Sequence, residues 1–327
     1  MNSFGRKFRV SIFGESHGGA VGVVLDGVPA GIPLNEEDFT DDLARRKSGQ
    51  RGTTPRKESD RPVILSGLFE EKTTGAPLTV VFANENTLSN DYRNLVTHPR
   101  PSHADWVARQ KFHGYADYRG GGHFSGRLTL GLVVAGTVAK KILEGVEITS
   151  RILEIGGCTD AERWPEVVEN AMRESDSVGG IIECRAEGAG VGLGEPFFDS
   201  AESVISHLLF SVPAVKGVEF GNGFACARLR GSQNNDPIVD PSGRTATNNA
   251  GGICGGITNG NPVVVRVAVK PTASIAAPQQ TLNMTTGTVQ ELRIRGRHDA
   301  CIALRAPVVI ESAVAIALAD LRLLDRP

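Results

Sequence analysis

The sequence is short of several residue types, and each shortage removes a class of protein from consideration. Its 327 residues contain only five cysteines, none in a Cys-x-x-Cys spacing, so we expect reduced thiols rather than a disulfide framework or a thiolate metal site. Charged residues interrupt the apolar stretches well before the ~20 residues of a membrane-spanning helix, and the N-terminus has no apolar signal segment. Aromatic residues make up only 6% of the chain, which leaves few rings to stack on RNA bases.

Neither sign of charge is in excess. The 35 basic side chains are balanced by 37 acidic ones, which argues against a surface built for nucleic acid or for an anionic membrane. Any binding site for an anion must therefore be local. Because 40% of the residues are hydrophobic and no low-complexity linker divides the chain, we expect residues 1–327 to fold as a single domain. The scattered cysteines and the interrupted apolar stretches lead us to expect a cytoplasmic protein without a resident metal.

Hydrophobic periodicity predicts a mixture of strands and helices. Short strands are expected over residues 21–25, 62–65, 78–82 and 262–269. Helices are expected over residues 35–47, 102–112, 125–143, 200–210 and 307–324, the first of them capped by Asn35. Because strands and helices do not alternate regularly, the pattern favours an α+β fold over a doubly wound parallel sheet.

The most informative segment is the turn Phe13-Gly14-Glu15-Ser16-His17-Gly18-Gly19. It places a carboxylate, a hydroxyl and an imidazole between glycines, which let a ligand approach closely, and histidine has a pKa near neutrality. Residues 14–18 also match the Gly-x-Ser-x-Gly motif of serine hydrolases, but that motif requires a following helix, and residues 20–25 have the pattern of a strand. A Gly-rich turn with a solvated histidine is the alternative to a reaction centre.

Four further segments carry basic or imidazole side chains, two of them among glycines. Residues 120–125 are expected to open the helix at 125–143, where free N–H groups bind anions, although a tight packing turn explains them equally well. Basic residues crowd the loop 45–57, which suits bidentate capture of phosphate or carboxylate, against the alternatives of a solvated charge run or an RNA-binding loop. Residues 100–105 and 297–299 each add an arginine and a histidine. Together these segments predict one polyanion site assembled from distant loops.

These segments, in this order, resemble the chorismate synthase family over nearly the whole chain. The resemblance is carried by FGESHGG at 13–19, the loop 45–60, RPSHAD at 100–105, YRGGG at 118–122, GLGEP at 192–196, RGSQ at 230–233, NNAGGICGG at 248–256, KPTAS at 270–274 and RHDACIALRA at 297–306. It implies an α+β fold with a helical core layered between antiparallel β-sheets, usually in a homotetramer. It also implies a lyase of the shikimate pathway of aromatic amino acid biosynthesis. This enzyme converts 5-enolpyruvylshikimate-3-phosphate into chorismate and phosphate by a 1,4-elimination that requires reduced FMN.

The resemblance also implies roles for individual residues. His17 would protonate the departing phosphate, and His103 would lie beside the flavin and supply its proton. Ser16 and Asp299 would relay the substrate's C6 proton by way of the flavin. The cations that hold the substrate's phosphate and carboxylates would be Arg46, Arg51, Arg100 and Arg127. FMN would lie along His123, Phe124, Ser125, Pro213, Ala214, Gly255, Lys270, Pro271, Thr272, Ala273, Ser274 and Arg297.

Three positions depart from the family's pattern. His123-Phe124-Ser125 stands where many members have Arg-Ser-Ser, so one permanent cation near the flavin phosphate is missing, and a helix N-terminus or Lys270 must replace it. Pro213 replaces an asparagine, and Ala300 replaces the proline of RHDP. The sequence leaves open whether the protein reduces its own flavin with NADPH or depends on a separate reductase, and whether it is a tetramer or a dimer.

Overall fold

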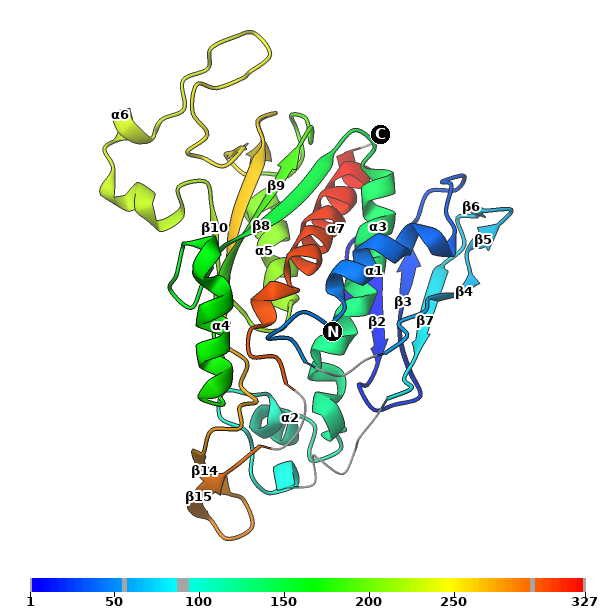
Figure 1. Ribbon diagram of the computed structural model, residues 1–327. Coiled ribbons are helices and arrows are strands. Elements are labelled where there is room, and N and C mark those ends of the chain that lie inside the picture. The colour runs from blue at the N-terminus through cyan, green and yellow to red at the C-terminus, as the bar shows by residue number, and fades with distance from the viewer. Residues whose placement is uncertain (1, 55–57, 87–93, 295–297, 326–327) are drawn as a thin grey trace.

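Two antiparallel sheets face each other across a layer of helices (Figure 1). The structure is a computed structural model that describes residues 2–54, 58–86, 94–294 and 298–325. The first sheet has the strand order β1 (Ser3–Phe4), β2 (Arg9–Gly14), β3 (Ala20–Asp26), β7 (Leu78–Ala83) and β4 (Val63–Ser66). The second has the order β10 (Val215–Phe220), β13 (Val263–Val269), β9 (Gly180–Glu187) and β8 (Glu147–Ile155). Two-stranded hairpins are β5 (Leu68–Phe69) with β6 (Lys72–Thr73), β11 (Ile253–Cys254) with β12 (Ile257–Thr258), and β14 (Gln279–Asn283) with β15 (Thr288–Leu292).

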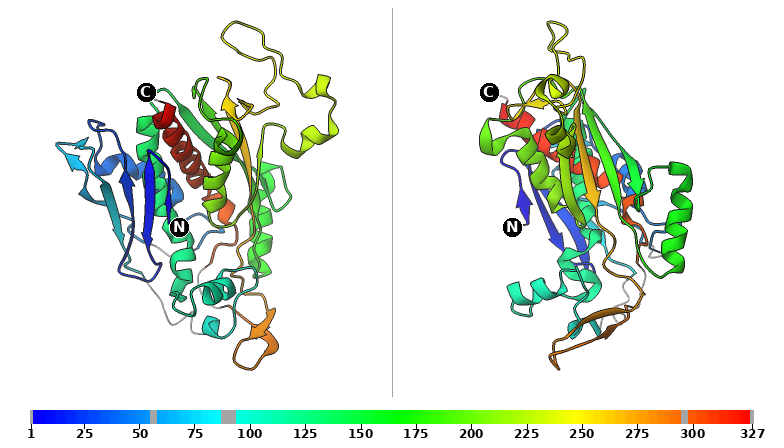
Figure 2. Two further views of the ribbon diagram at one scale, coloured as in Figure 1. Left: turned by 180° about the vertical axis from the view of Figure 1, so that it is seen from behind. Right: turned by 90° about the vertical axis from the view of Figure 1, so that its left-hand side faces the viewer.

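Four helices fill the space between the two sheets, as the view from behind in Figure 2 also shows. They are α1 (Thr40–Arg46), α3 (Thr129–Ile142), α5 (Ala201–Ser211) and α7 (Pro307–Asp325). Helix α3 packs against β3 of the first sheet, and α7 packs against β8 and β9 of the second. Outside this layer lie α2 (Asp105–Lys111), α4 (Trp164–Arg173) and α6 (Gly231–Asn234). The expected α+β class, with helices between antiparallel sheets, is confirmed.

Helix α7 forms the centre of the core. Every residue from position 308 to position 321 is buried, because the helix is apolar on nearly all sides and contacts α3, α5 and the second sheet. Its contact with α3 is close: a Cβ atom on Gly136 would lie 2.3 Å from the Cβ of Ser312. The buried carboxylate of Glu311 accepts hydrogen bonds from Arg45 and Ser150, so this acidic group is paired.

The same helix holds the N-terminal segment in place. Asp320 accepts hydrogen bonds from the backbone N–H groups of Arg6, Lys7 and Phe8, at distances from 2.7 to 3.1 Å. These three residues lead into β2, so the carboxylate at the end of α7 fixes the entry to the first sheet.

The expected strands at 21–25, 62–65, 78–82 and 262–269 are present as β3, β4, β7 and β13. Asn35 caps its helix as expected, through a capping box with Asp38, but the helix begins as a 3₁₀ turn before α1. The expected helix at 125–143 is shorter, since α3 begins at Thr129 after a 3₁₀ turn capped by Ser125. The turn at 15–19 joins two antiparallel strands, so the strand–turn–helix context of a serine hydrolase is absent. In the part of the chain that the structure describes, no helix combines the length and apolar character needed to cross a membrane.

Candidate active site

A cavity of about 770 Å³ opens where the helical layer meets several loops. Its walls come from six segments that are far apart in the sequence, at residues 46–60, 100–104, 120–127, 210–216, 270–274 and 298–305. Of the residues expected in the site, the lining includes Arg46, Arg100, Arg127, His103, His123, Phe124, Ser125, Pro213, Ala214, Lys270, Pro271, Thr272, Ala273, Ser274 and Asp299. The distant loops therefore meet, as the sequence predicts.

Five expected residues are not among the cavity lining. Ser16 and His17 are buried directly behind Gly120, which does line it. Arg51 points away, with 72% of its side chain exposed, and pairs with Glu169 at 2.7 Å. Gly255 lies in the β11–β12 hairpin. Arg297 lies outside the described residues, as do Arg56 and Lys57 of the basic loop.

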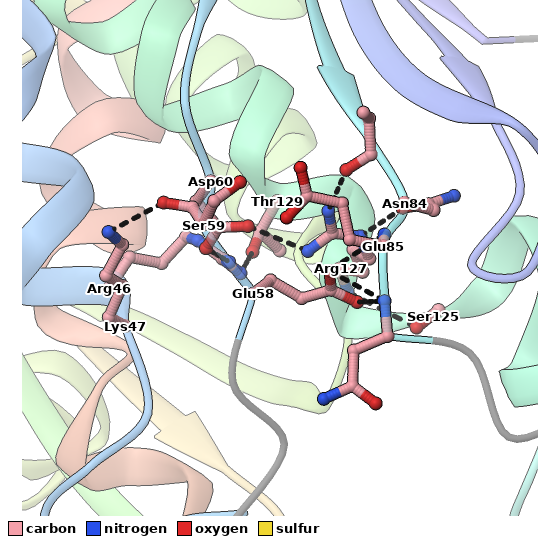
Figure 3. Close-up of polar contacts among 12 residues, drawn as sticks. Arg46, Lys47, Glu58, Ser59, Asp60, Asn84, Glu85, Ser125, Arg127 and Thr129 are labelled. Atoms are coloured by element: carbon pink, nitrogen blue, oxygen red, sulfur yellow. Dashed lines mark hydrogen bonds and ion pairs between the residues drawn. The ribbon is translucent and has the colours of Figure 1, made fainter.

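Two of the arginines share one buried carboxylate, Asp60, which the sequence did not single out (Figure 3). Asp60 Oδ2 accepts from Arg46 Nη2 at 3.0 Å, and Oδ1 accepts from Arg127 Nη1 at 2.8 Å. Burial by itself raises the pKa of Asp60, but the charges of Arg46 and Arg127 outweigh it and hold the pKa below its usual range. The three side chains therefore carry a net charge of about +1 in a buried position.

Arg46 retains an unused donor. Burial lowers the pKa of its guanidinium to about 10, so the group is still charged at neutral pH. Its Nη1 donates to Thr129 Oγ1 at 3.3 Å, while its Nε is buried and has no hydrogen-bond partner among the described residues. An orphaned N–H on a buried cation costs about 1–3 kcal/mol, which an anionic ligand would recover.

The second cationic group is Arg100, which is held together with His103 by Asp105. Arg100 donates to both oxygens of Asp105 at 2.7 Å, and Nδ1 of His103 lies 2.7 Å from Asp105 Oδ1. Since a carboxylate only accepts, Nδ1 carries the proton and Nε2 remains for a ligand. Burial raises the pKa of Asp105, but the hydrogen bonds from Arg100 and His103 hold it far below its usual range. Burial lowers the pKa of His103, so its imidazole is neutral at pH 7.

The turn at 14–18 packs against the glycine segment at 120–122. Ser16 N–H donates to Gly122 O at 3.1 Å, and His123 Nδ1 donates to Gly14 O at 2.7 Å. All three glycines have positive φ, and a Cβ atom on Gly120 would lie 2.6 Å from His17 Nε2. The glycines are therefore a left-handed turn that admits the imidazole, and not the N-terminus of the long helix that the sequence predicts.

Asp299 is buried in the cavity wall and is bound by Arg305. Its oxygens accept from Arg305 Nε at 3.0 Å and from Nη2 at 2.7 Å, and Oδ1 also accepts from the Thr54 N–H at 3.0 Å. Gly52 O accepts from the backbone N–H groups of Ala300 and Cys301, which ties the basic loop to this segment. Asp299 Oδ2 receives one of these bonds and therefore keeps a free lone pair.

Another part of the lining is largely without charge. It consists of Pro213 and Ala214 after α5, residues 271–274 after β13, and the half-exposed ring of Phe124. Thr272 Oγ1 is buried there without a hydrogen-bond partner among the described residues. Lys270 Nζ donates to Ser102 O at 2.6 Å, which leaves two of its three donors for a ligand.

Four residues of the site were not assigned a role from the sequence. Asp105 and Arg305 lie within quoted motifs, and Asp60 lies in the basic loop, so a search for carboxylates near arginines would have found candidates. Asn84, whose Oδ1 accepts from Arg127 Nε, stands alone after β7 and has no sequence signal.

The cavity gathers arginine, imidazole and carboxylate side chains, a set suited to an enzyme that binds a small polyanion and transfers protons. Residues 8–323 match the family described as Chorismate synthase. A chorismate synthase of Chitinophaga pinensis is 60% identical over 327 residues, covering 100% of this chain and 98% of that protein. One of Dehalococcoides mccartyi is 46% identical, covering 98% of this chain and 96% of the other. A solved crystal structure of chorismate synthase superposes with a TM-score of 0.76 at 28% identity, covering 98% of this chain and 93% of that one.

The chain therefore belongs to the chorismate synthase family. Its activity is that of the family: it is a carbon–oxygen lyase that converts 5-enolpyruvylshikimate-3-phosphate into chorismate and phosphate, in the pathway to the aromatic amino acids, with a reduced flavin. The expected enzyme class and reaction are thus confirmed.

Proposed function

We propose that the 770 Å³ cavity is where this elimination takes place, and that the flavin held there is FMN. The observation that carries the proposal is the unused Nε donor of Arg46, a buried cation in a wall that also contains Arg100 and Arg127. A buried guanidinium with an unpaired N–H is stabilised by a phosphate or carboxylate. The volume lies near the upper end of the roughly 300–1,000 Å³ of small-molecule sites, which suits two ligands lying together.

The largely uncharged part of the lining fits a reduced FMN. Proline, alanine and phenylalanine offer apolar surface to a ring system, and Thr272 Oγ1 offers an unpaired polar atom to its edge. His123 Nδ1 is committed to Gly14 O, so in its neutral form this residue has no N–H left for a phosphate, and Lys270 supplies the cation. When bound, the reduced flavin supplies an electron to the substrate and recovers it.

His17 is the proposed acid for the leaving phosphate. Its Nε2 faces Gly120, and because Gly120 has no side chain, a proton at Nε2 lies directly behind the cavity wall. An imidazole is suited to this step because its pKa is ordinarily near neutrality. The free lone pair on Asp299 Oδ2, in the cavity lining, is the proposed acceptor for the proton that the substrate loses, with Ser16 assisting beside His17.

The test is an anaerobic assay of chorismate formation from 5-enolpyruvylshikimate-3-phosphate, with chemically reduced FMN. We expect turnover with reduced FMN and none with oxidised FMN. Equal turnover without flavin, or with reduced riboflavin in place of FMN, would contradict the proposal. Replacing the chemical reductant by NADPH in the same assay decides whether the protein reduces its own flavin with NADPH or needs a separate reductase.

We also propose that the protein assembles as a homotetramer in the cytoplasm. Residues 221–262 project from the second sheet, as Figure 1 shows at the top of the molecule. They expose the apolar residues Phe224 and Ile238, which are 81% and 73% accessible and which an assembly could cover. The five free cysteines suit a reducing compartment. Light scattering should give a mass four times that of the 34.7 kDa chain, and a monomeric mass would contradict the assembly.

A further inference from the structure

Asn84 connects two parts of the site that come from different segments. It is the first residue after β7, and its backbone N–H donates to Gly19 O at 3.2 Å. Its side-chain Nδ2 donates to Glu15 O at 3.0 Å and to Gly18 O at 2.8 Å, on either side of His17. Its Oδ1 accepts from Arg127 Nε (Figure 3). One amide thus bonds both the turn that bears His17 and a guanidinium of the cavity wall.

This pattern requires an amide at position 84. A guanidinium can only donate and a backbone carbonyl can only accept, so the side chain between them must do both. Asparagine supplies two N–H groups and one oxygen, and all of them are used. An aspartate would accept from Arg127 but would face the carbonyls of Glu15 and Gly18 with oxygen, and an alanine would make none of the three bonds.

The connection continues beyond Arg127. Asp60 joins Arg127 to Arg46, so the turn, Asn84 and both guanidiniums form one hydrogen-bonded network. The structure therefore fixes the distance between the imidazole behind Gly120 and the cations in the wall through a few short contacts. A network of this kind keeps its geometry only while each member keeps its partners.

We propose that Asn84 is a positioning residue for the reaction: it holds the turn of His17 in register with Arg127, so that the proton and the phosphate-binding cation meet the same leaving group. This inference rests on the proposed function, in which His17 is the acid and Arg127 binds the substrate. Asn84 itself touches neither ligand in this account, and its effect is transmitted through His17. A displacement of about 1 Å is enough to lower a reaction rate by roughly 10²-fold.

The experiment is a double-mutant cycle on the full chain, with chorismate formation measured anaerobically with reduced FMN. Asn84→Ala should lower kcat by at least about tenfold and change KM by less than about threefold. In a His17→Ala background the same substitution should change kcat by less than about twofold, because the acid that Asn84 positions is already gone. Asn84→Asp, of the same size, serves if the alanine variant does not fold, and should lower kcat similarly.

Asn261→Ala is the matched control. Asn261 is buried, whereas Asn84 is partly buried. The amide of Asn261 also joins loop segments, since Nδ2 donates to Gly243 O and Oδ1 accepts from the Thr245 N–H, but these partners and Asn259 belong neither to the turn of His17 nor to the cavity lining. It should shift the melting temperature and leave kcat unchanged. The proposal is overturned if Asn84→Ala keeps the wild-type kcat, or if its effect is equally large with and without His17. Wild-type turnover in His17→Ala alone, by contrast, would refute the proposed acid.

Discussion

At the scale of single residues, Arg46 and Arg51 lie five positions apart but in opposite environments. The side chain of Arg46 is 6% exposed and is held by Asp60, whereas that of Arg51 is 72% exposed and pairs with Glu169. A buried, hydrogen-bonded cation contributes far more to anion binding than a surface ion pair, whose median contribution is about 0–1 kcal/mol.

We therefore expect Arg46→Ala and Arg51→Ala to differ in their effect on substrate binding, although the family resemblance implies the same role for both residues. Arg46→Ala should weaken substrate binding by about 1.5–3 kcal/mol, as for the loss of a charge-assisted hydrogen bond, and raise KM by about 10- to 100-fold. Arg51→Ala should change KM by less than about twofold. Steady-state kinetics at one fixed concentration of reduced FMN measures the KM of both variants. Equal changes in KM would show that Arg51 also binds the substrate.

Asp299 gives a second prediction at this scale. Asp299→Asn removes a carboxylate that can accept a proton and should lower kcat by about 10²–10⁴-fold while the dissociation constants of substrate and flavin stay nearly the same. It also disturbs the pair with Arg305, because one amide N–H would face the guanidinium. Arg305→Lys is the control, since it weakens the same pair and keeps the carboxylate, and its kcat should fall by about tenfold at most. A larger loss in Arg305→Lys than in Asp299→Asn would assign the effect to the ion pair.

The sequence predicts the residues that line the cavity better than the residues that hold them. Arg46, Arg100 and His103 are found because basic and imidazole side chains beside glycine and proline are unusual. Asp60 is not found, because its closeness to arginines in the sequence makes it a candidate counter-ion without showing that it is buried between two of them. Asn84 leaves no trace at all, since its partners at residues 15 and 18 are backbone carbonyls, which every residue has.

At the scale of elements, the contact of α3 with α7 depends on one missing side chain. A Cβ on Gly136 would lie 2.6 Å from the Cα of Ser312, so the two helix backbones approach more closely than any other residue at 136 permits. Gly136→Ala gains about 1 kcal/mol of helix propensity, but the clash is with backbone and cannot be relieved by a rotamer change.

The steric clash should outweigh the gain in helix propensity, so Gly136→Ala should lower the free energy of unfolding by about 1–3 kcal/mol. Gly231→Ala in α6 is the matched control, because a Cβ there meets nothing within 4 Å and the backbone φ is not positive. It should leave the stability unchanged or raise it by up to about 1 kcal/mol. Urea unfolding followed by circular dichroism compares the two, and a Gly136→Ala variant as stable as the control would show that the helices move apart without strain.

The elements themselves could be predicted in part. Strand β13 and helix α7 follow from clear apolar patterns, but the glycines at 120–122 are placed at a helix start by the sequence and in a left-handed turn by the structure. Free N–H groups and positive φ both favour glycine, so composition cannot separate them. Strand β8 was not anticipated, because it is an edge strand whose sequence mixes charged and apolar residues.

At the scale of the whole molecule, acid should destabilise the fold in two separate pH windows. Burial lowers the pKa of His103 in the folded protein, so below about pH 6.5 the unfolded chain takes up a proton that the folded one does not, and stability falls as the pH falls. Burial raises the pKa values of Asp60 and Asp105, but their arginine partners hold both pKa values below the usual range. Their contribution is therefore present above about pH 4 and is lost as the pH falls further.

The loss of stability below about pH 6.5 can be tested for its dependence on His103 with the variant His103→Gln. Its free energy of unfolding, from urea titrations at about pH 7.5, 6 and 5, should fall less steeply than that of the wild type, since the other histidines are common to both proteins. Below about pH 4 the two proteins should lose stability in parallel. Identical slopes between pH 7.5 and 5 would mean that His103 does not titrate differently in the folded and unfolded chains.

Helix α7 occupies the middle of the core, and its Asp320 binds the backbone of residues 6–8. This central helix nevertheless comes late in the sequence, at residues 307–325. During translation, both sheets leave the ribosome before the helix that separates and supports them. The faces of β8 and β9 that pack against α7 therefore stay uncovered until almost all of the chain described here has emerged, whereas the first sheet packs against α3, which is made earlier. Exposed apolar surface and unpaired strands aggregate, so the nascent chain is open to aggregation until α7 has emerged. The interval between the synthesis of the second sheet and the synthesis of α7 is therefore the stage at which this enzyme is most exposed to aggregation.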